Sequence, residues 1–272
     1  MKFWKNTSTL DQLENVHGIN DTVDPHLAEI AVIGSKTIDL DELPKLKGIF
    51  KCGVGVDNVP FEDAKKRSIK ICLPSEKTKR IIFEETANFT IYLIMRMIYD
   101  RNGDFESWQK RSREYLGKLK VLVIGQGNIG KIVKKKMELF TEVVTFDIST
   151  NKMNDLEGYI STADIITLHV PLNSETKSFI DREKLSWIKD DAALINTSRG
   201  PIVDEDALFD EINSGRIRAA FDVFWNEPYK GKLTCFEPHQ FLMTPHVSST
   251  CKDFIEGLGH DLKDFVFKLT SS

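Results

Sequence analysis

The stretch Leu119-Lys-Val-Leu-Val-Ile-Gly-Gln-Gly-Asn-Ile-Gly130 joins a short apolar run to three glycines and opens directly into a helical pattern. The apolar run predicts a buried strand, and the glycines that follow it predict a phosphate-binding turn. In such a turn Gly125 allows the tight bend, Gly127 lets a pyrophosphate approach the backbone, and Gly130 lets the next helix pack close to the strand. The free amides and positive dipole end of that helix would then face the anion.

The residues after the glycines complete a strand–helix–strand unit. Residues 131–140 carry apolar side chains at helical spacing, and residues 142–147 read as a second strand that ends in a carboxylate. Asp147 lies 17 residues beyond Gly130, near the spacing at which an acidic side chain binds the hydroxyls of an adenosine ribose. A plain strand–turn–helix without a nucleotide is the alternative, but this context favours a dinucleotide.

The composition is that of an ordinary globular protein. A chain of 272 residues with 41% hydrophobic content is long enough for two domains, each with its own core. A formal net charge of −4 gives no general attraction to nucleic acid or to an anionic membrane. The lysine cluster within residues 131–136 is most simply the solvated face of a helix.

The cysteines and the first residues bear on compartment and metal binding. Cys52, Cys72, Cys235 and Cys251 form neither a C-x-x-C pair nor a metal-ligand spacing, so we expect reduced thiols, no metal site and a cytoplasmic location. The first five residues lack the apolar run of a secretion signal. The most apolar segment, Phe89–Ile98, is too short to span a bilayer.

The first hundred residues alternate between strand and helix patterns, which predicts a parallel sheet. We expect strands at residues 2–5, 27–34, 48–52 and 69–73, and helices at residues 9–16, 40–46 and 61–67.

A glycine-flanked turn, Lys51-Cys-Gly-Val-Gly-Val-Asp57-Asn58, follows one of these strands. Open α/β sheets bind their ligands at the carboxyl ends of strands, where the exposed amides of Val54 and Gly55 could hold a carboxylate. The alternative is a tight loop whose glycines only permit positive φ and whose Asp57 caps the next helix. The residues alone leave both interpretations open.

Residues 84–100 form the longest helical pattern, and the middle of this pattern is apolar almost all round. Such a helix must be buried on several sides, and we predict a homodimer on this ground. After the polar stretch 101–117 and the nucleotide unit, further strands are expected at residues 164–171, 192–200, 218–224 and 241–246, each ending in polar residues. A last helix begins near Cys251 and is expected to return to the first domain.

Six motifs in this order resemble those of the D-isomer-specific 2-hydroxyacid dehydrogenase family. They are Gly53-Val-Gly-Val-Asp57, Gly125-x-Gly-x-x-Gly130 with Asp147, His169-Val-Pro-Leu172, Asn196-Thr-Ser-Arg199-Gly200, Asp222-Val-Phe-Trp-Asn-Glu227-Pro228 and Thr244-Pro-His246. The resemblance covers most of the chain. It implies a Rossmann domain with a doubly wound parallel sheet at residues 100–248, and a smaller flavodoxin-like α/β substrate domain built from residues 1–99 and 249–272.

The resemblance also implies an NAD-dependent, reversible reduction of a small anionic 2-keto acid to the D-2-hydroxy acid. It assigns Arg199, Glu227 and His246 to catalysis. Histidine titrates nearest to neutral pH and is the natural acid/base, while Glu227 would orient its ring and favour the protonated form. Arg199 offers a planar fork to the substrate carboxylate, which a lysine would bind less specifically.

The cofactor contacts that the resemblance implies run along the second half of the chain. They comprise Gly125, Gly127, Asn128, Ile129 and Gly130 at the pyrophosphate, Asp147 at the adenosine ribose, His169 and Pro171 beside the adenine half, and Thr197, Ser198 and Asp222 around the nicotinamide. Asp147 would repel a 2′-phosphate and no arginine follows within residues 148–151, so NAD is favoured over NADP.

The sequence departs from the family at the substrate side. Thr86-Ala87-Asn88 stands where many members have Val-Ala-Glu, and residues 75–85 form a longer segment than usual. Lys51 is a candidate for binding a second anionic group of the substrate, as are Lys77, Lys79 and Arg80. Two rival functions are an NAD-sensing interaction protein of the corepressor type and a dehydrogenase that acts on formate or phosphite.

Overall fold

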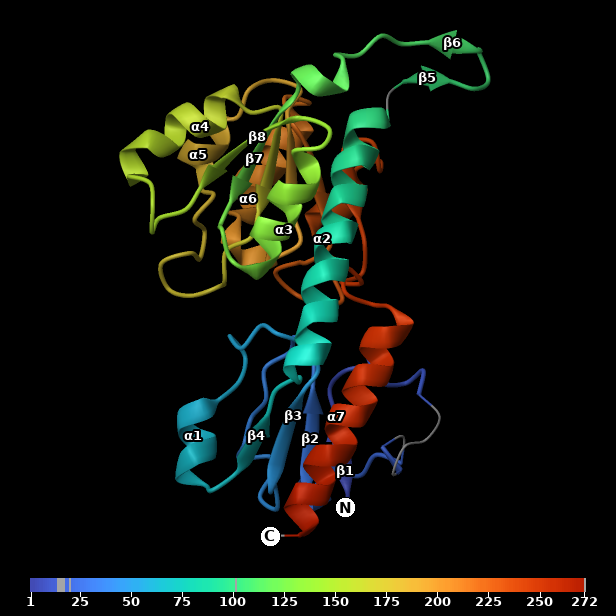
Figure 1. Cartoon of the computed structure of the whole chain (residues 1–272), viewed down its shortest axis with the longest axis vertical. Coiled ribbons are helices and arrows are strands. Elements are labelled where there is room, and N and C mark those ends of the chain that lie inside the picture. The colour runs from blue at the N-terminus through green and yellow to red at the C-terminus, as the bar shows by residue number, and fades with distance from the viewer. Residues whose placement is uncertain (14–17, 20, 101, 272) are drawn as a thin grey trace. The chain divides into compact units, whose positions relative to one another are not determined.

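The computed structural model describes residues 1–13, 18–19, 21–100 and 102–271, and it divides into two compact units. Unit 1 comprises Met1–Ile82 and Ser249–Ser272, and unit 2 comprises Phe83–Ser248 (Figure 1). Unit 2 is therefore inserted into unit 1 along the chain. The boundary expected after residue 99 lies at one end of helix α2 (Glu76–Tyr99), whereas the units divide within this helix.

Unit 1 is built on a parallel sheet with the strand order β1-β2-β3-β4. The strands are β1 (Phe3–Lys5), β2 (Ile30–Ile33), β3 (Gly48–Lys51) and β4 (Lys70–Cys72). Both faces are covered, since β2 and β3 are buried along their whole length. Ile30 and Val32 pack with helix α7 (Lys252–Thr270), and the alternate residues Ala31 and Ile33 pack with the cluster that includes helix α1 (Phe61–Lys66).

Helix α7 lies directly on strand β3. A Cβ atom built on Gly48 would come within 2.7 Å of the Phe265 ring and 2.8 Å of Leu269, so only glycine allows this approach. The face of α7 that meets the sheet carries Phe254, Leu258, Leu262 and Phe265, all buried. The last helix of the chain thus completes the core of unit 1.

Of the short helices predicted in unit 1, the one at residues 40–46 is wrong, and the described part of the one at residues 9–16 is not helical. Residues 9–13 form turns, while residues 14–17, which include the rest of the first predicted helix, lie outside the described residues. Residues 40–46 form two successive turns closed by hydrogen bonds of 3.2 and 3.1 Å. Pro44 explains the second case, because it has no N–H to donate and restricts the residue before it.

Helix α2 begins at Glu76, well before residue 84, where the prediction placed its start. Ser75 stands just before it, and the Ser75 hydroxyl accepts a hydrogen bond from the Thr78 amide at 3.3 Å. The Ser75 amide in turn donates to Asp261 of α7 at 2.9 Å. Pro74 and a serine at the helix start are recognised start signals, although the apolar pattern begins only later.

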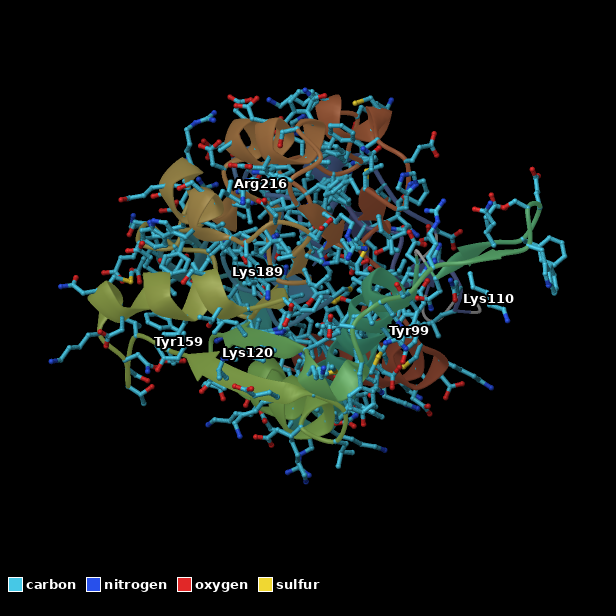
Figure 2. All side chains as sticks on the ribbon, turned by 90° about the horizontal axis from the view of Figure 1, so that it is seen from above. Tyr99, Lys110, Lys120, Tyr159, Lys189 and Arg216 are labelled. Atoms are coloured by element: carbon cyan, nitrogen blue, oxygen red, sulfur yellow. The ribbon has the colours of Figure 1, made fainter. Side chains whose placement is uncertain are left out.

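The polar stretch 101–117 contains a small antiparallel hairpin, β5 (Gly103–Asp104) and β6 (Gln109–Lys110), which the sequence analysis did not predict. Phe105 and Trp108 sit in its turn, 84% and 75% exposed, with their rings edge to face at 5.5 Å. The hairpin, with Lys110 on its second strand, extends away from the sheet of unit 2 (Figure 2).

Unit 2 has a six-stranded parallel sheet with the order β12-β11-β10-β9-β7-β8. Its strands are β7 (Lys120–Ile124), β8 (Glu142–Phe146), β9 (Ile165–Leu168), β10 (Ala193–Asn196), β11 (Arg218–Phe221) and β12 (Phe241–Met243). The chain moves outward from β7 in both directions, so the strand order switches between β7 and β9. This confirms the predicted Rossmann-type sheet.

Helices cover both faces of this sheet (Figure 1). The second half of α2 and helix α3 (Asn128–Met137) pack on one face. The other face carries α4 (Leu156–Thr162), α5 (Arg182–Trp187) and α6 (Glu205–Asn213). Short 3₁₀ turns lie at Pro25–Leu27, Leu116–Lys118, Met153–Asp155, Gly200–Ile202 and Lys232–Cys235. None of the helices in the described part of the chain combines the length and apolar character needed to cross a bilayer.

Candidate active site

The strands of unit 2 end in register at one edge of the sheet, which we call the carboxyl edge. The last residues of adjacent strands pair directly with one another: Phe146 with Ile124, Ile124 with Leu168, Leu168 with Asn196, Asn196 with Phe221, and Phe221 with Met243. The residues that follow, Gly125, Asp147, His169, Thr197, Asp222 and Thr244, therefore form a row. Five inter-strand spacings of about 4.8 Å give this row a length of roughly 24 Å.

The glycine loop follows β7, beside the point where the strand order switches. A Cβ on Gly125, whose φ is +97°, would lie 2.4 Å from the His169 carbonyl oxygen, and a Cβ on Gly130 would lie 2.0 Å from the Gly125 carbonyl oxygen. These two glycines are required by packing within the protein. Gly127 differs, because its φ of −73° suits any residue and no atom lies within 4 Å of a Cβ placed there.

Open space at Gly127 faces the start of helix α3. Gly127 is the N-cap residue of this helix, and no side chain caps the first amides, while the first turn carries no acidic residue. Amides without intrahelical partners at a helix start, together with the helix dipole, bind phosphate groups. The residues present therefore fit the pyrophosphate of a dinucleotide at Asn128 and Ile129.

Asp147 ties the end of β8 to the glycine loop. One carboxylate oxygen accepts the Gln126 amide at 2.7 Å, and the other accepts the Ser149 amide at 2.9 Å and the Ser149 hydroxyl at 2.6 Å. These bonds, that of the Ser149 hydroxyl above all, lower the pKa of Asp147 below its ordinary value. The carboxylate is thus ionised at neutral pH, as an acceptor for ribose hydroxyls must be.

His169 follows β9 and is half-buried. Its Nε2 lies 3.0 Å from the hydroxyl of Thr167, which is fully buried. Burial lowers the pKa of His169 to about 3, so that the ring is neutral at physiological pH and cannot serve as an acid there. Pro171, two residues further on, is exposed.

A fully buried asparagine, which the sequence analysis did not assign, fixes the Arg199 segment. The Asn196 side chain donates to the Arg199 carbonyl at 2.9 Å and accepts from the Ser198 amide at 3.0 Å. The Ser198 hydroxyl donates to the carbonyl of Leu168 at 2.5 Å. The available signal was a polar residue at the end of the apolar run Ala-Ala-Leu-Ile-Asn, where burial requires such partners.

The Arg199 side chain is held by the backbone of the preceding residue, since one guanidinium nitrogen donates to the Ser198 carbonyl at 2.8 Å. Gly200 follows, and a Cβ there would lie 2.1 Å from the carbonyl carbon of Phe224. The segment that leads to Glu227 therefore passes directly against the Arg199 turn.

His246 and Glu227 form a hydrogen-bonded pair. Nδ1 of His246 lies 2.8 Å from one carboxylate oxygen of Glu227 and 3.0 Å from the other. The amide of Phe224 donates to the same carboxylate at 3.2 Å and helps to hold it in place. Both side chains are half-buried. With Nδ1 bound to the carboxylate, Nε2 is the ring atom left to exchange a proton with a reactant.

Asp222, fully buried, fixes the turn that presents His246. Its carboxylate accepts the Thr244 hydroxyl at 2.6 Å and the amides of Val247 and Ser248, each at 2.9 Å. His246 itself has a φ of +53°, in the left-handed region that costs a non-glycine residue roughly 1–2 kcal/mol. These bonds on both sides of His246 stabilise that conformation. Thr244 is a second residue whose role the sequence analysis did not assign.

Thr197 is linked to helix α2. Its hydroxyl lies 2.8 Å from the hydroxyl of Thr90, and Thr90 itself donates to the Thr86 carbonyl at 2.8 Å. Because each hydroxyl has one hydrogen, Thr197 must be the donor to Thr90. The oxygen of Thr197 consequently keeps acceptor capacity.

The substrate contacts predicted for Lys51, Val54 and Gly55 lie in unit 1. Val54 and Gly55 are partly exposed, whereas Lys51 is only 2% exposed and donates to the Gly34 carbonyl and, at 2.7 Å, to Asn58. Helix α1 has Pro60, and not Asp57, as its N-cap residue. The alternative interpretation of the Gly53–Asp57 loop, in which Asp57 is the cap of the next helix, is therefore not supported at Asp57.

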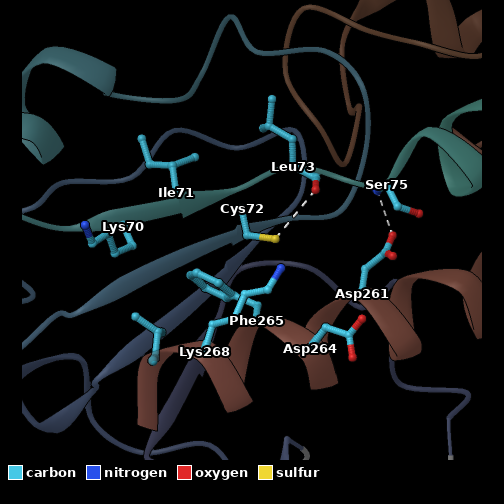
Figure 3. Close-up of a pocket in the computed structure, with 10 residues that line it drawn as sticks. Lys70, Ile71, Cys72, Leu73, Ser75, Asp261, Asp264, Phe265 and Lys268 are labelled. Carbon is cyan, nitrogen blue, oxygen red and sulfur yellow. Dashed lines mark hydrogen bonds between the residues drawn. The ribbon is translucent and has the colours of Figure 1, made fainter. Parts of the chain in front are cut away.

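A cavity of about 450 Å³ in unit 1 contains none of the predicted site residues. It lies between β4 and α7 and is lined among others by Lys70, Cys72, Asp261 and Phe265 (Figure 3). Burial, with a contribution from Asp261, raises the pKa of the Cys72 thiol, so this thiol stays protonated. All four cysteines are free thiols, and the described residues hold no group of three side chains suited to a metal ion.

Comparison with known proteins decides the family. Residues 92–248 match the NAD-binding domain of D-isomer specific 2-hydroxyacid dehydrogenases. The chain belongs to this family. A hydroxypyruvate reductase from Thermotoga maritima is 30% identical over 85% of this chain and 80% of its own length. A glycerate dehydrogenase from Methylorubrum extorquens is 33% identical over 88% of this chain and 82% of its own length.

The structures agree on the fold of this dehydrogenase. A D-lactate dehydrogenase from Aquifex aeolicus, solved with NAD and lactic acid, is superposable with a TM-score of 0.80 over the whole chain and 96% of its own, at 22% identity. The protein is an NAD-dependent oxidoreductase of the D-2-hydroxyacid dehydrogenase type. The glycine loop with its open Gly127 is the part of the chain that fits this cofactor.

Proposed function

We propose that this dehydrogenase reduces a small 2-keto acid to the D-2-hydroxy acid, reversibly, and that Arg199, Glu227 and His246 carry the chemistry. The observation that supports this most is the Glu227–His246 pair, with Nδ1 at 2.8 Å from the carboxylate, at the edge where the dinucleotide fold presents its loops. A bound NADH supplies the hydride from its nicotinamide ring. The protein must then supply a proton to the keto oxygen and must hold the carboxylate.

His246 is the proton donor and acceptor in this proposal. The Glu227 carboxylate accepts the Nδ1 hydrogen, which fixes the tautomer and orients the ring. The same carboxylate stabilises the imidazolium that donates from Nε2 during reduction. In the oxidative direction the neutral ring takes the hydroxyl proton at the same atom.

Arg199 binds the substrate carboxylate. A guanidinium presents five N–H donors in a plane, and its bond to the Ser198 carbonyl keeps the group near the strand end. In unit 1, the partly exposed Val54 and Gly55 are the proposed substrate contacts, through amides that could hold a carboxylate. Unit 1 is accordingly the substrate domain and unit 2 the cofactor domain.

For the cofactor, we assign the pyrophosphate to the amides of Asn128 and Ile129 beside Gly127, and the adenosine ribose to Asp147. His169 and Pro171 would flank the adenine half. Around the nicotinamide, Thr197 can accept a hydrogen bond from the carboxamide with the oxygen that Thr90 leaves available. Ser198 and Asp222 complete this group, with Asp222 also holding the His246 turn.

NAD rather than NADP is the proposed physiological cofactor. Asp147 is ionised and hydrogen-bonded in place, so a 2′-phosphate would meet a fixed negative charge. We expect at least tenfold higher kcat/KM with NADH than with NADPH. Equal values for the two would contradict the role given to Asp147.

We also propose a homodimer in the cytoplasm. Ala87, Leu93 and Met97 of α2 are buried within unit 2, so the apolar middle of this helix is covered partly by its own chain. Exposed aromatic side chains remain, above all Phe105 and Trp108 of the hairpin, and such side chains are enriched at interfaces. Light scattering should give twice the chain mass.

The proposed cytoplasmic location rests on the cysteines, because free thiols suit a reducing compartment.

The test is oxidation of NADH by the purified protein with a panel that contains glyoxylate, pyruvate and hydroxypyruvate, and chiral analysis of the product. The reverse arm supplies NAD⁺ with formate. We expect turnover of a 2-keto acid to the D product and none of formate. His246→Ala should lose at least about 100-fold in kcat while NADH affinity is kept. Near-normal turnover in this variant would remove His246 from the mechanism.

A further inference from the structure

Lys51 is a buried cation beside the loop to which we assign the substrate carboxylate. Only 2% of the residue is exposed. Its ammonium donates to the carbonyl oxygen of Gly34 and to the side-chain oxygen of Asn58 at 2.7 Å. A buried ammonium persists only where such acceptors replace its water, so these bonds are a condition of its burial.

Asn58 extends this contact to a second loop. Its side chain is 8% exposed, and its amide nitrogen donates to the Gly34 carbonyl at 2.9 Å and to the Lys36 carbonyl at 2.6 Å. Lys51, Asn58 and the Gly34–Lys36 loop thus form one buried polar network, which we call the Lys51 network. It joins the ends of β2 and β3 to the far end of the Gly53–Asp57 loop.

The Gly53–Asp57 loop needs such a support. Gly53 has a φ of +153° and no side chain to pack, and a Cβ there would meet no atom within 4 Å, whereas the next residue, Val54, packs against the core of unit 1. Glycines gain more freedom in an unfixed loop than other residues do. The Lys51–Asn58 hydrogen bond joins the residues on either side of the loop and so restricts the conformations that the loop can adopt.

We infer that Lys51 is a positioning residue, which holds the Val54 and Gly55 amides in the geometry that binds the substrate carboxylate, and that it does not bind a second anionic group of the substrate. This inference rests on the proposed function. The sequence suggested that Lys51 contacts such a group. To do so, the ammonium would have to leave both acceptors and reach solvent, and the side-chain oxygen of Asn58 would lose this donor inside the protein, although Asn58 would still donate to the Gly34 carbonyl.

For specificity, this means that Lys51 at the end of β3 makes the Gly53–Asp57 loop rigid and does not recognise a second charged group on the substrate. A preorganised loop lowers the cost of binding every 2-keto acid, because all of them share the carboxylate. A direct ligand would instead favour only those substrates that carry a further phosphate or carboxylate. The two roles therefore differ in how a Lys51 variant treats a matched pair of substrates.

The test compares hydroxypyruvate with its phosphorylated analogue, phosphohydroxypyruvate, in Lys51→Met, Lys51→Arg and Asn58→Ala. A positioning role predicts that Lys51→Met and Asn58→Ala each raise KM for every substrate that is turned over by about the same factor, at least fivefold, with a smaller change in kcat. Lys51→Arg should restore part of the loss. NADH affinity, measured by fluorescence, should stay at the wild-type value, since the cofactor contacts lie in unit 2.

Lys47→Met is the matched control, because Lys47 lies in the same unit, is 58% exposed and pairs only at the surface with Glu29. It should keep the wild-type KM. Hydrogen exchange of residues 53–57 supplies a readout independent of turnover and should become faster in Lys51→Met and in Asn58→Ala. An unchanged KM for hydroxypyruvate in Lys51→Met, or a loss confined to phosphohydroxypyruvate, would overturn the inference. Absence of any 2-keto acid reduction by the wild type would instead refute the proposed function.

Discussion

The Glu227–His246 pair at the carboxyl edge allows the effect of the negative charge of Glu227 to be measured separately from the effect of its hydrogen bond. Glutamine at position 227 keeps an oxygen acceptor for Nδ1 but removes the negative charge. We expect kcat for reduction to fall by about 100-fold in Glu227→Gln. An amide stabilises the imidazolium less than a carboxylate does, so the loss should fall on kcat while the affinity for NADH is kept.

Steady-state kinetics of wild type and Glu227→Gln side by side, together with NADH affinity measured by fluorescence, provide the measurement. An unchanged kcat in the variant would show that the charge of Glu227 does not assist His246.

For His169 we predict an effect on the free energy of unfolding and not on the reaction rate. Burial lowers the pKa of His169 to about 3, whereas a histidine in the unfolded chain titrates near 6.5. Between these values the unfolded chain binds the extra proton, so the free energy of unfolding falls as the pH drops from about 6.5 toward 3.

Urea unfolding at pH 7 and pH 5 checks this, with His169→Asn as the comparison. Wild type should lose about 1–2 kcal/mol more than the variant over this interval. Equal losses in the two proteins would contradict a neutral His169 in the folded state.

At the scale of one residue, the sequence allowed the proposed catalytic residues to be named, but not the residues that hold them in place. Arg199, Glu227 and His246 could be named because their residue types suit the chemistry and their motifs follow the family. Asn196 and Thr244 could not, because their importance lies in hydrogen bonds to the Arg199 carbonyl and to Asp222 that only the folded chain reveals.

Among the elements, helix α3 packs closely against the glycine loop at Gly130. A methyl group at Gly130 would lie 2.0 Å from the Gly125 carbonyl oxygen, so Gly130→Ala must push the helix from the strand. Overpacking of this kind costs about 1–3 kcal/mol of unfolding free energy. Gly158 in α4 is the matched control, since its Cβ would meet no atom within 4 Å.

Urea unfolding of both variants is the measurement. Gly158→Ala should be as stable as wild type or up to about 1 kcal/mol more stable, because alanine is the better helix former. A Gly130→Ala protein as stable as wild type would show that α3 does not lie this close to the loop.

Element boundaries were the part of the fold least accessible from the pattern. The strand from residue 119 and a helix at residues 131–140 were predicted because apolar periodicity and turn chemistry agree there, and the structure has this helix three residues earlier, at Asn128–Met137. Helix α2 starts at Glu76 because Ser75 and the neighbouring Asp261 secure its first turn, while the apolar pattern begins only near residue 84. The predicted helix at residues 40–46 was wrong because Pro44 outweighs the spacing of the leucines.

Across the whole chain, two units arise because the strands and helices of unit 2 are inserted between the two segments that form unit 1. The switch in strand order beside β7 places the glycine loop, Asp147 and His169 side by side, although they are far apart in sequence. This arrangement follows from the parallel pairing of strands and was predictable. The aromatic hairpin at residues 103–110 was not, because its exposed Phe105 and Trp108 contribute no burial pattern.

Whether the glycine loop binds the dinucleotide is tested most directly by calorimetric titration of NADH into wild type and Gly127→Ala. The alanine methyl meets no protein atom within 4 Å and φ is ordinary, so the fold should stay within about 1 kcal/mol of wild-type stability. The methyl would occupy the space assigned to the pyrophosphate. Wild type should bind NADH and Gly127→Ala at least tenfold more weakly, a loss of about 1.4 kcal/mol or more. Equal affinities, or no binding by wild type at millimolar NADH, would contradict the site.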